Sequence, residues 1–546
     1  MIHPGRLDWH IRKADSLLLD APRHVSARTE YTGLAMLLVL GAFLRLATLS
    51  HDSLWADEAY TLSVAQLPFA HLWGVPFDVH PPLFYSLVKV FLAFGLSEAT
   101  VRIASALAST FTLLVVYFLT KWLIGNVGAL VTLALSATSY TSLVYADDGR
   151  NYALLSAFLL LSYSALFQVV QALRSDDPVP NRTTLLGWSA TYNIAAVAAL
   201  YTHNSAVFYI ASANMAWALV VLFTSPRELV RFCLRLVVLN GLVVLAWLPW
   251  LMTLFSTSAD FTWLEQARPI EAIRTLLVTI LPNNISVPGA LAYLAIIGAG
   301  TIIALRRGVT LLTVVCFHLI AFPFFIWMFG FVYKPIFMER TVLPAIFGGA
   351  LSVGVVLAFL RSRFVAILIA CIAISLSLVS SASYLGRGKD KDHYGAHIVQ
   401  DWRSAVAESP GGDRSAIVLC EPFSHPAVSF YAPDTSILFL RSNNNLLPVT
   451  NAQWRKLYGM PATARLPHLE ESLARIVAED DVSELSIDQL AERFDHVTTV
   501  RANIFCDDSF LSSSIERFRQ AGFEADPLRS YPGVTARTFN GTFPQD

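Results

Sequence analysis

The stretch "AMLLVLGAFLRLATLSHDSLWADEAY", Ala35 to Tyr60, places an acidic pair directly after an apolar run. A second polar motif, "DVHPPLFY" from Asp78 to Tyr85, follows soon after. An apolar segment that crosses lipid must satisfy its backbone groups internally, which favours a helix. The stretch therefore predicts a membrane helix with two carboxylates, Asp57 and Glu58, close to its end.

The composition extends this interpretation to the whole chain. Its 546 residues are 55% hydrophobic and 14% charged, and the mean hydropathy is +0.53. A soluble protein of this length carries more charge, so the composition predicts a polytopic membrane protein. The net charge of −1 gives no sign of a nucleic-acid partner. No small-residue cleavage pattern follows the basic segment 1–30, which we expect to be a cytoplasmic tail rather than a signal peptide.

Apolar runs long enough to cross about 30 Å of hydrocarbon recur as far as residue 385. They predict eleven spans, at residues 31–49, 100–121, 127–145, 152–173, 186–202, 204–223, 232–253, 288–305, 309–332, 341–360 and 364–384. The segment 82–96 is shorter, opens with two prolines and carries Lys89. We expect it to lie flat at the membrane interface.

Basic residues orient these spans. With a cytoplasmic N-terminus, nearly every short inner loop is basic, through Lys121, Arg174, Arg182, Arg227, Arg231, Arg235, Arg306, Arg307, Arg361 and Arg363. Treating 82–96 as a span would move these residues outside, against the positive-inside rule. The outer face then receives the chain after residue 385 and the loops 50–99, 145–151, 202–204, 254–287 and 333–340.

Near Gly386 the composition changes to that of a soluble domain. Strand patterns at 415–420, 436–441, 496–500 and 534–539 alternate with helical patterns at 394–407, 467–478 and 510–521. The predicted fold class is an all-α polytopic membrane protein with a C-terminal extracytoplasmic α/β domain. No glycine-rich phosphate loop follows the first strand, so we assign no nucleotide site to this domain. The predicted domains are 1–30, 31–385 and 386–546.

The five cysteines fall into two groups. Cys233, Cys316 and Cys371 lie in predicted spans and are expected to be ordinary core residues. Cys420 and Cys506 lie in the outer domain, where an oxidising compartment permits a disulfide. A disulfide and two free thiols are equally compatible with the sequence.

Asp57 and Glu58 are the first candidates for catalysis. An acidic pair in an outer loop is often only a solvated feature, and composition alone allows that explanation. This pair, however, lies within a few residues of the hydrocarbon and is flanked by Trp55 and Tyr60, which favour the interface. A carboxylate held there is suited to act as a general base.

A second charged motif, "YADDGRNYAL" (Tyr145 to Leu154), lies at the junction of two predicted spans. Asp147 and Asp148 are candidate catalytic acids, and Arg150 and Tyr152 are candidate substrate ligands. A helix cap, a first-turn acid and a snorkelling arginine would explain the motif without function. That explanation suits Asp148 alone, but it leaves unexplained why three charges gather on the predicted face of Asp57.

Other outer turns add polar residues. His80 precedes two prolines that fix an extended entry to segment 82–96. His203 and Asn204 occupy a tight turn and are equally well explained as ordinary turn residues. In "YKPIFMERTVLP" (Tyr333 to Pro344), Lys334 and Arg340 run against the positive-inside bias, which indicates a negative partner from lipid or substrate.

Acids that accept a proton and cations that hold a phosphate thus share one predicted membrane face. No ATP or nucleotide motif is visible. Because the outer face has no nucleotide supply, an activated substrate there would most simply be attached to a lipid phosphate.

The order of the motifs resembles that of a known group. After an apolar helix come "LWADEAYTL", "HPPLFYSL", "SEATVRIASAL", "YADDGRNYAL", "LYTHN" and "PIFMERTVLPA". They resemble the GT-C superfamily of integral-membrane glycosyltransferases, in particular its protein O-mannosyltransferase and lipid A aminoarabinose transferase-like branch, over residues 31–385. The resemblance implies an inverting hexosyl- or pentosyltransferase of the cell envelope. Its donor would be a polyprenyl-phosphate sugar, used at the outer face of what is expected to be a bacterial inner membrane.

The resemblance also implies residue roles. Asp57 would take the proton of the acceptor hydroxyl, with Glu58 supporting it. Asp147 or Asp148 matches the acid of the second outer loop, and the arginine after that acid is Arg150.

Two further positions concern the donor phosphate. Arg340 matches a late outer arginine expected near it. Some members have a lysine before the proline pair, where this chain has His80, so a phosphate role at position 80 departs from the pattern. The family is divided over a divalent metal such as Mg or Mn, for which Asp57, His80 and Asp147 are candidate ligands although no spacing motif supports them.

Two other classes of function compete. A transporter of lipids or lipid-linked sugars would use the outer carboxylates as a proton relay. It would need polar groups at mid-membrane, and the predicted spans are nearly free of ionisable residues. A structural or assembly protein would not need the "DE" and "HPP" motifs. The sugar and the acceptor, whether a cell-wall glycan, a lipid or a protein, stay open.

Overall fold

The computed structural model describes residues 21–74, 80–174, 182–256, 265–332, 335–387, 399–419, 424–440, 446–448, 485–502 and 515–541. The chain divides into two compact units. The helical unit comprises Met1–Thr48, Ile103–Leu251 and Phe261–Gly386. The mixed unit comprises Leu49–Arg102, Met252–Asp260 and Arg387–Asp546.

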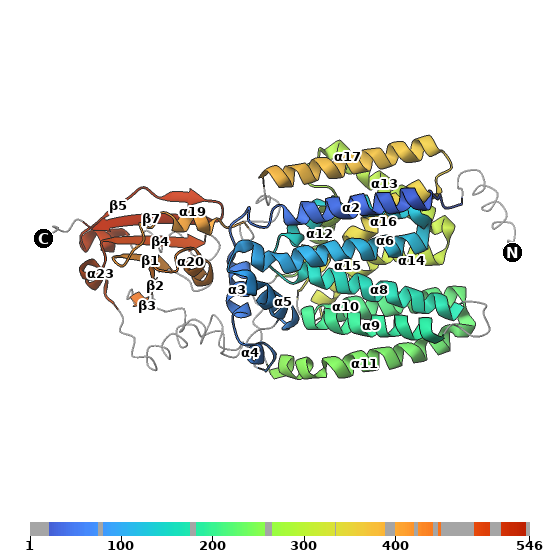
Figure 1. The fold of residues 1–546 in the computed structure, drawn as a ribbon, viewed down its shortest axis with the longest axis horizontal. Helices are drawn as coiled ribbons and strands as arrows, with labels where there is room; N and C mark the ends of the chain where they lie inside the picture. Colours follow the sequence, from blue (N-terminus) through green and yellow to red (C-terminus); the bar gives the residue numbers. More distant parts are fainter. Residues whose placement is uncertain are drawn as a thin grey trace. The chain divides into compact units, whose positions relative to one another are not determined.

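The helical unit is a bundle of long and short helices that are mostly apolar (Figure 1). In chain order they are α2 (Ala27–Leu46), α6 (Glu98–Ala137, which starts in the mixed unit), α7 (Tyr140–Ala146), α8 (Tyr152–Arg174), α9 (Arg182–Thr202), α10 (Ala206–Thr224), α11 (Leu229–Ser256), α12 (Pro269–Ile280), α13 (Val287–Arg307), α14 (Val309–Cys316), α15 (Phe322–Gly330), α16 (Ala345–Phe359) and α17 (Arg363–Arg387). Short turns of helix complete them at η2 (Pro226–Glu228), η3 (Phe317–Ala321) and η4 (Glu339–Thr341).

Eight helices in the described part of the chain are long and apolar enough to cross a membrane: Ala27–Leu46, Glu98–Ala137, Tyr152–Leu173, Ala206–Thr224, Pro226–Phe255, Val287–Arg307, Val309–Gly330 and Arg363–Gly386. The predicted spans 186–202 and 341–360 form α9 and the 15-residue α16, which are not among these eight. The prediction of a polytopic helical protein is confirmed.

Helix α6 accounts for two predicted spans because it is kinked. Gly125, at the kink, has a φ of 79°. A Cβ atom there would lie 3.2 Å from the ring of His24, so glycine serves both the left-handed backbone and the close approach. The helix then ends at Ala137, and Ser139 caps the separate helix α7. The predicted span 127–145 is therefore interrupted, because a serine cap starts a new helix.

Arg45, in the last turn of α2, is fully buried and joins three helices. Its guanidinium donates to Ser109 Oγ at 2.7 Å, to Gly41 O and Ala137 O at 3.0 Å, to Ser136 O at 3.1 Å and to Ser142 Oγ at 2.8 Å. These bonds use all five N–H groups of an arginine. Because the last carbonyls of a helix lack intrahelical donors, Arg45 caps the end of α6.

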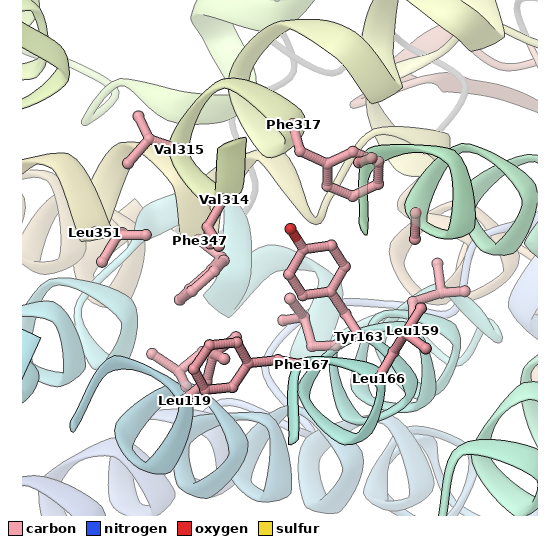
Figure 2. Packing of buried hydrophobic residues seen from close by; sticks show 14 of the residues in the cluster. Leu119, Leu159, Tyr163, Leu166, Phe167, Val314, Val315, Phe317, Phe347 and Leu351 are labelled. Carbon is pink, nitrogen blue, oxygen red and sulfur yellow. The ribbon is translucent and has the colours of Figure 1, made fainter. Parts of the chain in front are cut away.

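The core of the helical unit is aromatic and aliphatic (Figure 2). Tyr163 of α8 lies among Leu159, Phe167, Phe317 and Phe347, and its ring centroid is 5.0 Å from that of Phe317. Within the part of the chain that the structure describes, the buried Tyr163 hydroxyl finds no hydrogen-bond partner.

The mixed unit contains a seven-stranded sheet (Figure 1). Its order is β3-β2-β1-β4-β7-β5, with β6 also paired to β7. Only the β1–β2 and β1–β4 pairs among these are parallel. The strands are β1 (Ser415–Leu419), β2 (Ser436–Leu440), β3 (Leu446–Pro448), β4 (His496–Ala502), β5 (Phe523–Ala525), β6 (Arg529–Tyr531) and β7 (Val534–Gly541). The four predicted strands are therefore present, and the three-residue strands β3, β5 and β6 were not predicted.

Short helices accompany the sheet: α3 (Ala56–Ala65), α4 (Phe69–Gly74), α5 (Leu83–Phe91), η1 (Leu92–Phe94), α19 (Trp402–Val406), α20 (His425–Tyr431) and α23 (Ile487–Arg493). Residues 515–520 are also helical, within the predicted pattern 510–521, whereas the predicted helix 467–478 lies outside the described residues. The predicted interfacial segment 82–96 forms α5 and η1, which are too short to span a membrane.

The loop 50–99 packs with the C-terminal sheet in one hydrophobic cluster. Leu54, Ala59, Leu62 and Val101 share that cluster with side chains of α19, α20 and the sheet. The mixed unit therefore combines an early loop and the C-terminal domain. Cys233, Cys316 and Cys371 are free thiols, but Cys233 and Cys371 are exposed and Cys316 is half-buried, so the expectation of core residues is wrong for them. Cys420 and Cys506 lie outside the described residues.

Candidate active site

Asp57 lies in the first turn of α3 in the mixed unit, and its side chain is half-buried. Helix α3 starts after Trp55, whose extended backbone forms the N-cap. The adjacent Glu58 reaches back and accepts a hydrogen bond from the Trp55 N–H at 3.2 Å. The first turn of a helix favours negative charge, because its N–H groups point at the carboxylates.

Glu58 differs from Asp57 in being fully buried in an ion pair with Arg102. Arg102 Nε lies 2.7 Å from Glu58 Oε1, and Arg102 Nη2 lies 2.7 Å from Glu58 Oε2. Both side chains have no solvent-exposed surface. This two-bond geometry with a guanidinium is the strong form of a carboxylate pair. It suits Glu58 to a supporting role rather than to proton transfer.

Arg102 was not among the predicted site residues, although it holds the loop before Asp57 in place. Its remaining N–H groups donate to the carbonyl oxygens of Leu49, Asp52 and Ser53 at 2.9–3.0 Å. Together with the two bonds to Glu58, all five donors of the guanidinium are used. Arg102 thus fixes the loop that precedes Asp57. A buried arginine near the start of an apolar helix was the available signal, since such a charge needs partners.

His80 is half-buried before Pro81 and Pro82, ahead of α5 in the mixed unit. The neighbouring Asp78 and, in the helical unit, Lys334 lie outside the described residues. The predicted substrate-binding roles of His80 and Lys334 stay predictions.

In the helical unit, the turn between α7 and α8 carries Asp147, Asp148 and Arg150, and all three are buried. Tyr384 of α17 donates its hydroxyl to Asp147 Oδ2 at 2.7 Å. Two further hydrogen bonds anchor the turn: Ser105 Oγ donates to Arg150 O at 2.9 Å, and the side chain of Asn151, in the turn itself, donates through Nδ2 to Thr202 O at 2.8 Å. Three separate helices therefore hold this turn in place.

Three predicted substrate ligands come together beside that turn. The guanidinium of Arg340, on η4, lies over the ring of Tyr152 at 5.3 Å from its centroid. The ring of His203 lies 5.7 Å from that of Tyr152, and His203 Nδ1 accepts a hydrogen bond from the Ser205 N–H at 3.0 Å. A cation held over an aromatic face has a restricted orientation and still presents N–H donors to a ligand.

The two turns are also connected through Tyr145. Its ring is 6.0 Å from that of Tyr152, over which the guanidinium of Arg340 lies. The turn after α7 and the turn at η4 therefore lie close together inside the helical unit.

A small cavity of about 50 Å³ lies next to this group. Its lining includes Ser109, Ser142, Tyr145, Ser156 and Pro344. Pockets for small molecules measure roughly 300–1,000 Å³, so this cavity suits water rather than a sugar.

A divalent metal is the remaining predicted component of the site. Among the residues that the structure describes, no three His, Cys, Asp or Glu side chains are arranged to hold a metal ion. Metal ligation by Asp57, His80 and Asp147 stays a prediction.

Comparisons with solved structures identify the fold of the chain. No family model matches the sequence, and no curated protein matches it. The structure is similar to ArnT from Cupriavidus metallidurans in the apo state, with a TM-score of 0.59 and 13% sequence identity over 94% of this chain and 98% of that chain. It is also similar to ArnT from the same organism bound to undecaprenyl phosphate, with a TM-score of 0.58 and 13% identity over 94% of this chain and 99% of that one. The chain therefore has the GT-C fold that its motifs predicted.

Proposed function

We propose that this chain, with the fold of ArnT, is an integral-membrane glycosyltransferase that moves a sugar from a polyprenyl-phosphate donor to a hydroxyl group of an acceptor. The observation that carries the proposal is the likeness to ArnT over 94% of the chain, since one of those ArnT structures is bound to undecaprenyl phosphate. Such a transfer needs a proton acceptor for the hydroxyl group and a cation for the leaving phosphate.

Asp57 is the proposed general base. Its carboxylate would take the proton of the acceptor hydroxyl as that oxygen attacks the anomeric carbon of the sugar. The bond between the anomeric carbon and the phosphate oxygen breaks, and its electron pair leaves with the lipid phosphate. A single displacement of this kind inverts the anomeric centre. Glu58 is unsuited to the same task because Arg102 and the Trp55 N–H already occupy its carboxylate.

Arg340 is the proposed ligand of the donor phosphate, with Tyr152 and His203 beside it. The phosphate gains negative charge as it leaves, so a cation fixed in advance lowers the barrier. The position of Arg340 over the Tyr152 ring supplies that fixation. Arg150 contributes further positive charge from the same buried turn.

The membrane orientation belongs to the same proposal. The basic residues of the predicted inner loops favour a cytoplasmic N-terminus, and we propose that the candidate residues lie at the outer face. A bacterial inner membrane suits this arrangement. The acceptor would then be a cell-wall glycan, a lipid or a protein that is reached from outside the cytoplasm.

A donor screen tests the proposal. Purified full-length protein in lipid vesicles would be incubated with radiolabelled polyprenyl-phosphate mannose, arabinose and galacturonate, and the release of polyprenyl phosphate would be followed. We expect one donor to be consumed by the wild-type protein and spared by Asp57→Asn. Movement of labelled donor between leaflets without consumption would instead support a transporter. If no donor is consumed and none moves between leaflets, the proposal is refuted for these sugars.

A further inference from the structure

Residues 54–56 precede Asp57, and the backbone N–H group of each donates a hydrogen bond to a side chain. The Leu54 N–H donates to the hydroxyl of Tyr431 at 2.8 Å. The Trp55 N–H donates to Glu58, and the Ala56 N–H donates to Oε1 of Gln400 at 2.9 Å. Two of the three acceptors therefore belong to the C-terminal domain.

Gln400 is built into the domain that supplies it. It is only 3% exposed, and its Oε1 also accepts a hydrogen bond from the indole N–H of Trp402 at 2.9 Å. Two donors that converge on one atom fix the amide orientation, because a flipped amide would present its own N–H groups to them. Trp402 is fully buried in the cluster that contains Leu54 and Ala59. The position of Ala56 is thus tied to the core of the C-terminal domain.

Tyr431 is fixed in the same way. Its hydroxyl donates to Glu98 Oε1 at 3.1 Å, and Arg403 Nη2 donates to the same oxygen at 2.7 Å. Burial raises the pKa of Tyr431 to about 12, so the hydroxyl stays protonated at neutral pH and can donate to Glu98 while accepting from Leu54. The backbone N–H of Arg403 also donates to Ser53 Oγ at 3.2 Å.

We propose that Gln400 and Tyr431 are positioning residues for transfer, through which the C-terminal domain fixes the backbone of residues 54–56 and hence the location of Asp57. This inference rests on the proposed function of Asp57. It gives the C-terminal domain a part in catalysis that is separate from any binding of the acceptor. The physical reason is that a general base works only within hydrogen-bond reach of its proton, and a displacement of about 1 Å can cost about a hundredfold in rate.

The test uses full-length protein in lipid and two readouts. The first is hydrogen exchange at the backbone amides of residues 54–56, which reports local opening. The second is transfer kinetics with the donor identified by the screen. The variants are Gln400→Ala and Tyr431→Phe. The matched control is Tyr531→Phe in the same domain. The hydroxyl that it removes donates to Glu408 and not to residues 54–56.

We expect slow exchange at residues 54–56 in the wild type and faster exchange in both variants. We also expect kcat to fall by about tenfold to a hundredfold. The donor KM should stay within about twofold of wild type, because the proposed phosphate ligands are in the helical unit. The control should behave as wild type in both readouts. A general loss of folding would instead alter exchange throughout the domain.

Several results would overturn the inference. Fast exchange at residues 54–56 in the wild type would show that the segment is not held. Unchanged exchange in the variants would show that these side chains do not hold it, and faster exchange with normal kcat would show that the restraint is unimportant. If Gln400→Ala fails to fold, Tyr431→Phe, which removes a single oxygen atom, decides. If wild-type protein consumes no donor, the proposed function fails while the exchange data still decide whether the segment is held.

Discussion

The acidic pair Asp57–Glu58 begins a helix in the mixed unit, and the pair Asp147–Asp148 ends one in the helical unit. In the first pair the two carboxylates are in different environments: Glu58 is fully buried in an ion pair with Arg102, and Asp57 is half-buried. In the second pair both carboxylates are buried, and Tyr384 donates to Asp147. Two similar sequence motifs are thus built differently.

The comparison shows that a buried carboxylate can serve the architecture of a site as well as its chemistry. A carboxylate whose oxygens are occupied by a guanidinium has little capacity to accept another proton. By this criterion Glu58 is better suited to shape the loop around Asp57 than to accept a proton. The following substitutions test that distinction, from the largest expected effect to the smallest.

Replacing Asp57 by asparagine removes the proposed base and keeps the side-chain shape. We expect transfer to fall by about 10²–10⁴-fold, the usual contribution of general acid–base catalysis. The protein should still fold, as judged by its elution and thermal unfolding in detergent. The control is Asp52→Asn, which alters an acid of the same loop that bonds to His51. Transfer by Asp57→Asn within a few-fold of the control would remove Asp57 from the role.

Replacing Glu58 by glutamine should mainly affect stability. Loss of one partner of a buried ion pair costs about 3–5 kcal/mol, because Arg102 would keep a buried charge without its counterion. Thermal unfolding should therefore shift to clearly lower temperature. Arg414 and Asp495 form a two-bond pair with the same 2.7 Å distances at the surface of the mixed unit, and Asp495→Asn there should leave the midpoint unchanged. Equal shifts in the two variants would argue against the buried pair as a structural element.

Replacing Arg340 by alanine should weaken donor binding and spare acceptor binding. A hydrogen bond to a charged group contributes about 1.5–3 kcal/mol, which corresponds to roughly tenfold to a hundredfold in affinity. Titration with the donor identified by the screen measures this. Arg307→Ala is the matched control, since Arg307 also lies over an aromatic ring, that of Phe359, but belongs to a predicted inner loop. Unchanged donor affinity in Arg340→Ala would contradict the assignment.

The smallest effects concern two buried tyrosines. Tyr384→Phe deprives Asp147 of a hydroxyl donor, and we expect a loss of about 1–3 kcal/mol in stability. Tyr163→Phe removes a hydroxyl that has no partner among the described residues, so its effect should be near zero or slightly stabilising. Thermal unfolding of the two variants side by side measures the difference. Similar losses in both would mean that the Tyr384 hydrogen bond to Asp147 contributes little.

Much of the fold could be predicted because its signals are local. The apolar runs marked the long helices, and short strand-like segments marked β1, β2, β4 and β7. The three-residue strands β3, β5 and β6 are too short for a periodicity to be seen. The interruption before α7 depends on one serine cap, which a long apolar run conceals.

The candidate site was predictable only in part, because its contacts are distant in sequence. The motifs placed Tyr152, His203 and Arg340 on one predicted face, and the structure brings these three together. The partners that decide what each acid does are elsewhere: Arg102 is 44 residues from Glu58, and Tyr384 is 237 residues from Asp147. A single sequence can mark Arg102 as a charge that needs a partner, but it does not identify Glu58 as that partner.

Arg45 has a consequence for biogenesis. Its guanidinium is satisfied only by groups of α2, α6 and α7, and Ser142 is synthesised 97 residues after it. An arginine at the centre of an isolated helix costs about 2.5–3.5 kcal/mol on insertion, and less near an end. Until the intervening residues are made, Arg45 lacks its partners from α6 and α7. We therefore expect α2 to stay beside the translocon during that time. Release of α2 into lipid would follow the synthesis of α6 and α7. The order in which the helices enter the lipid would then differ from the order in which they are synthesised.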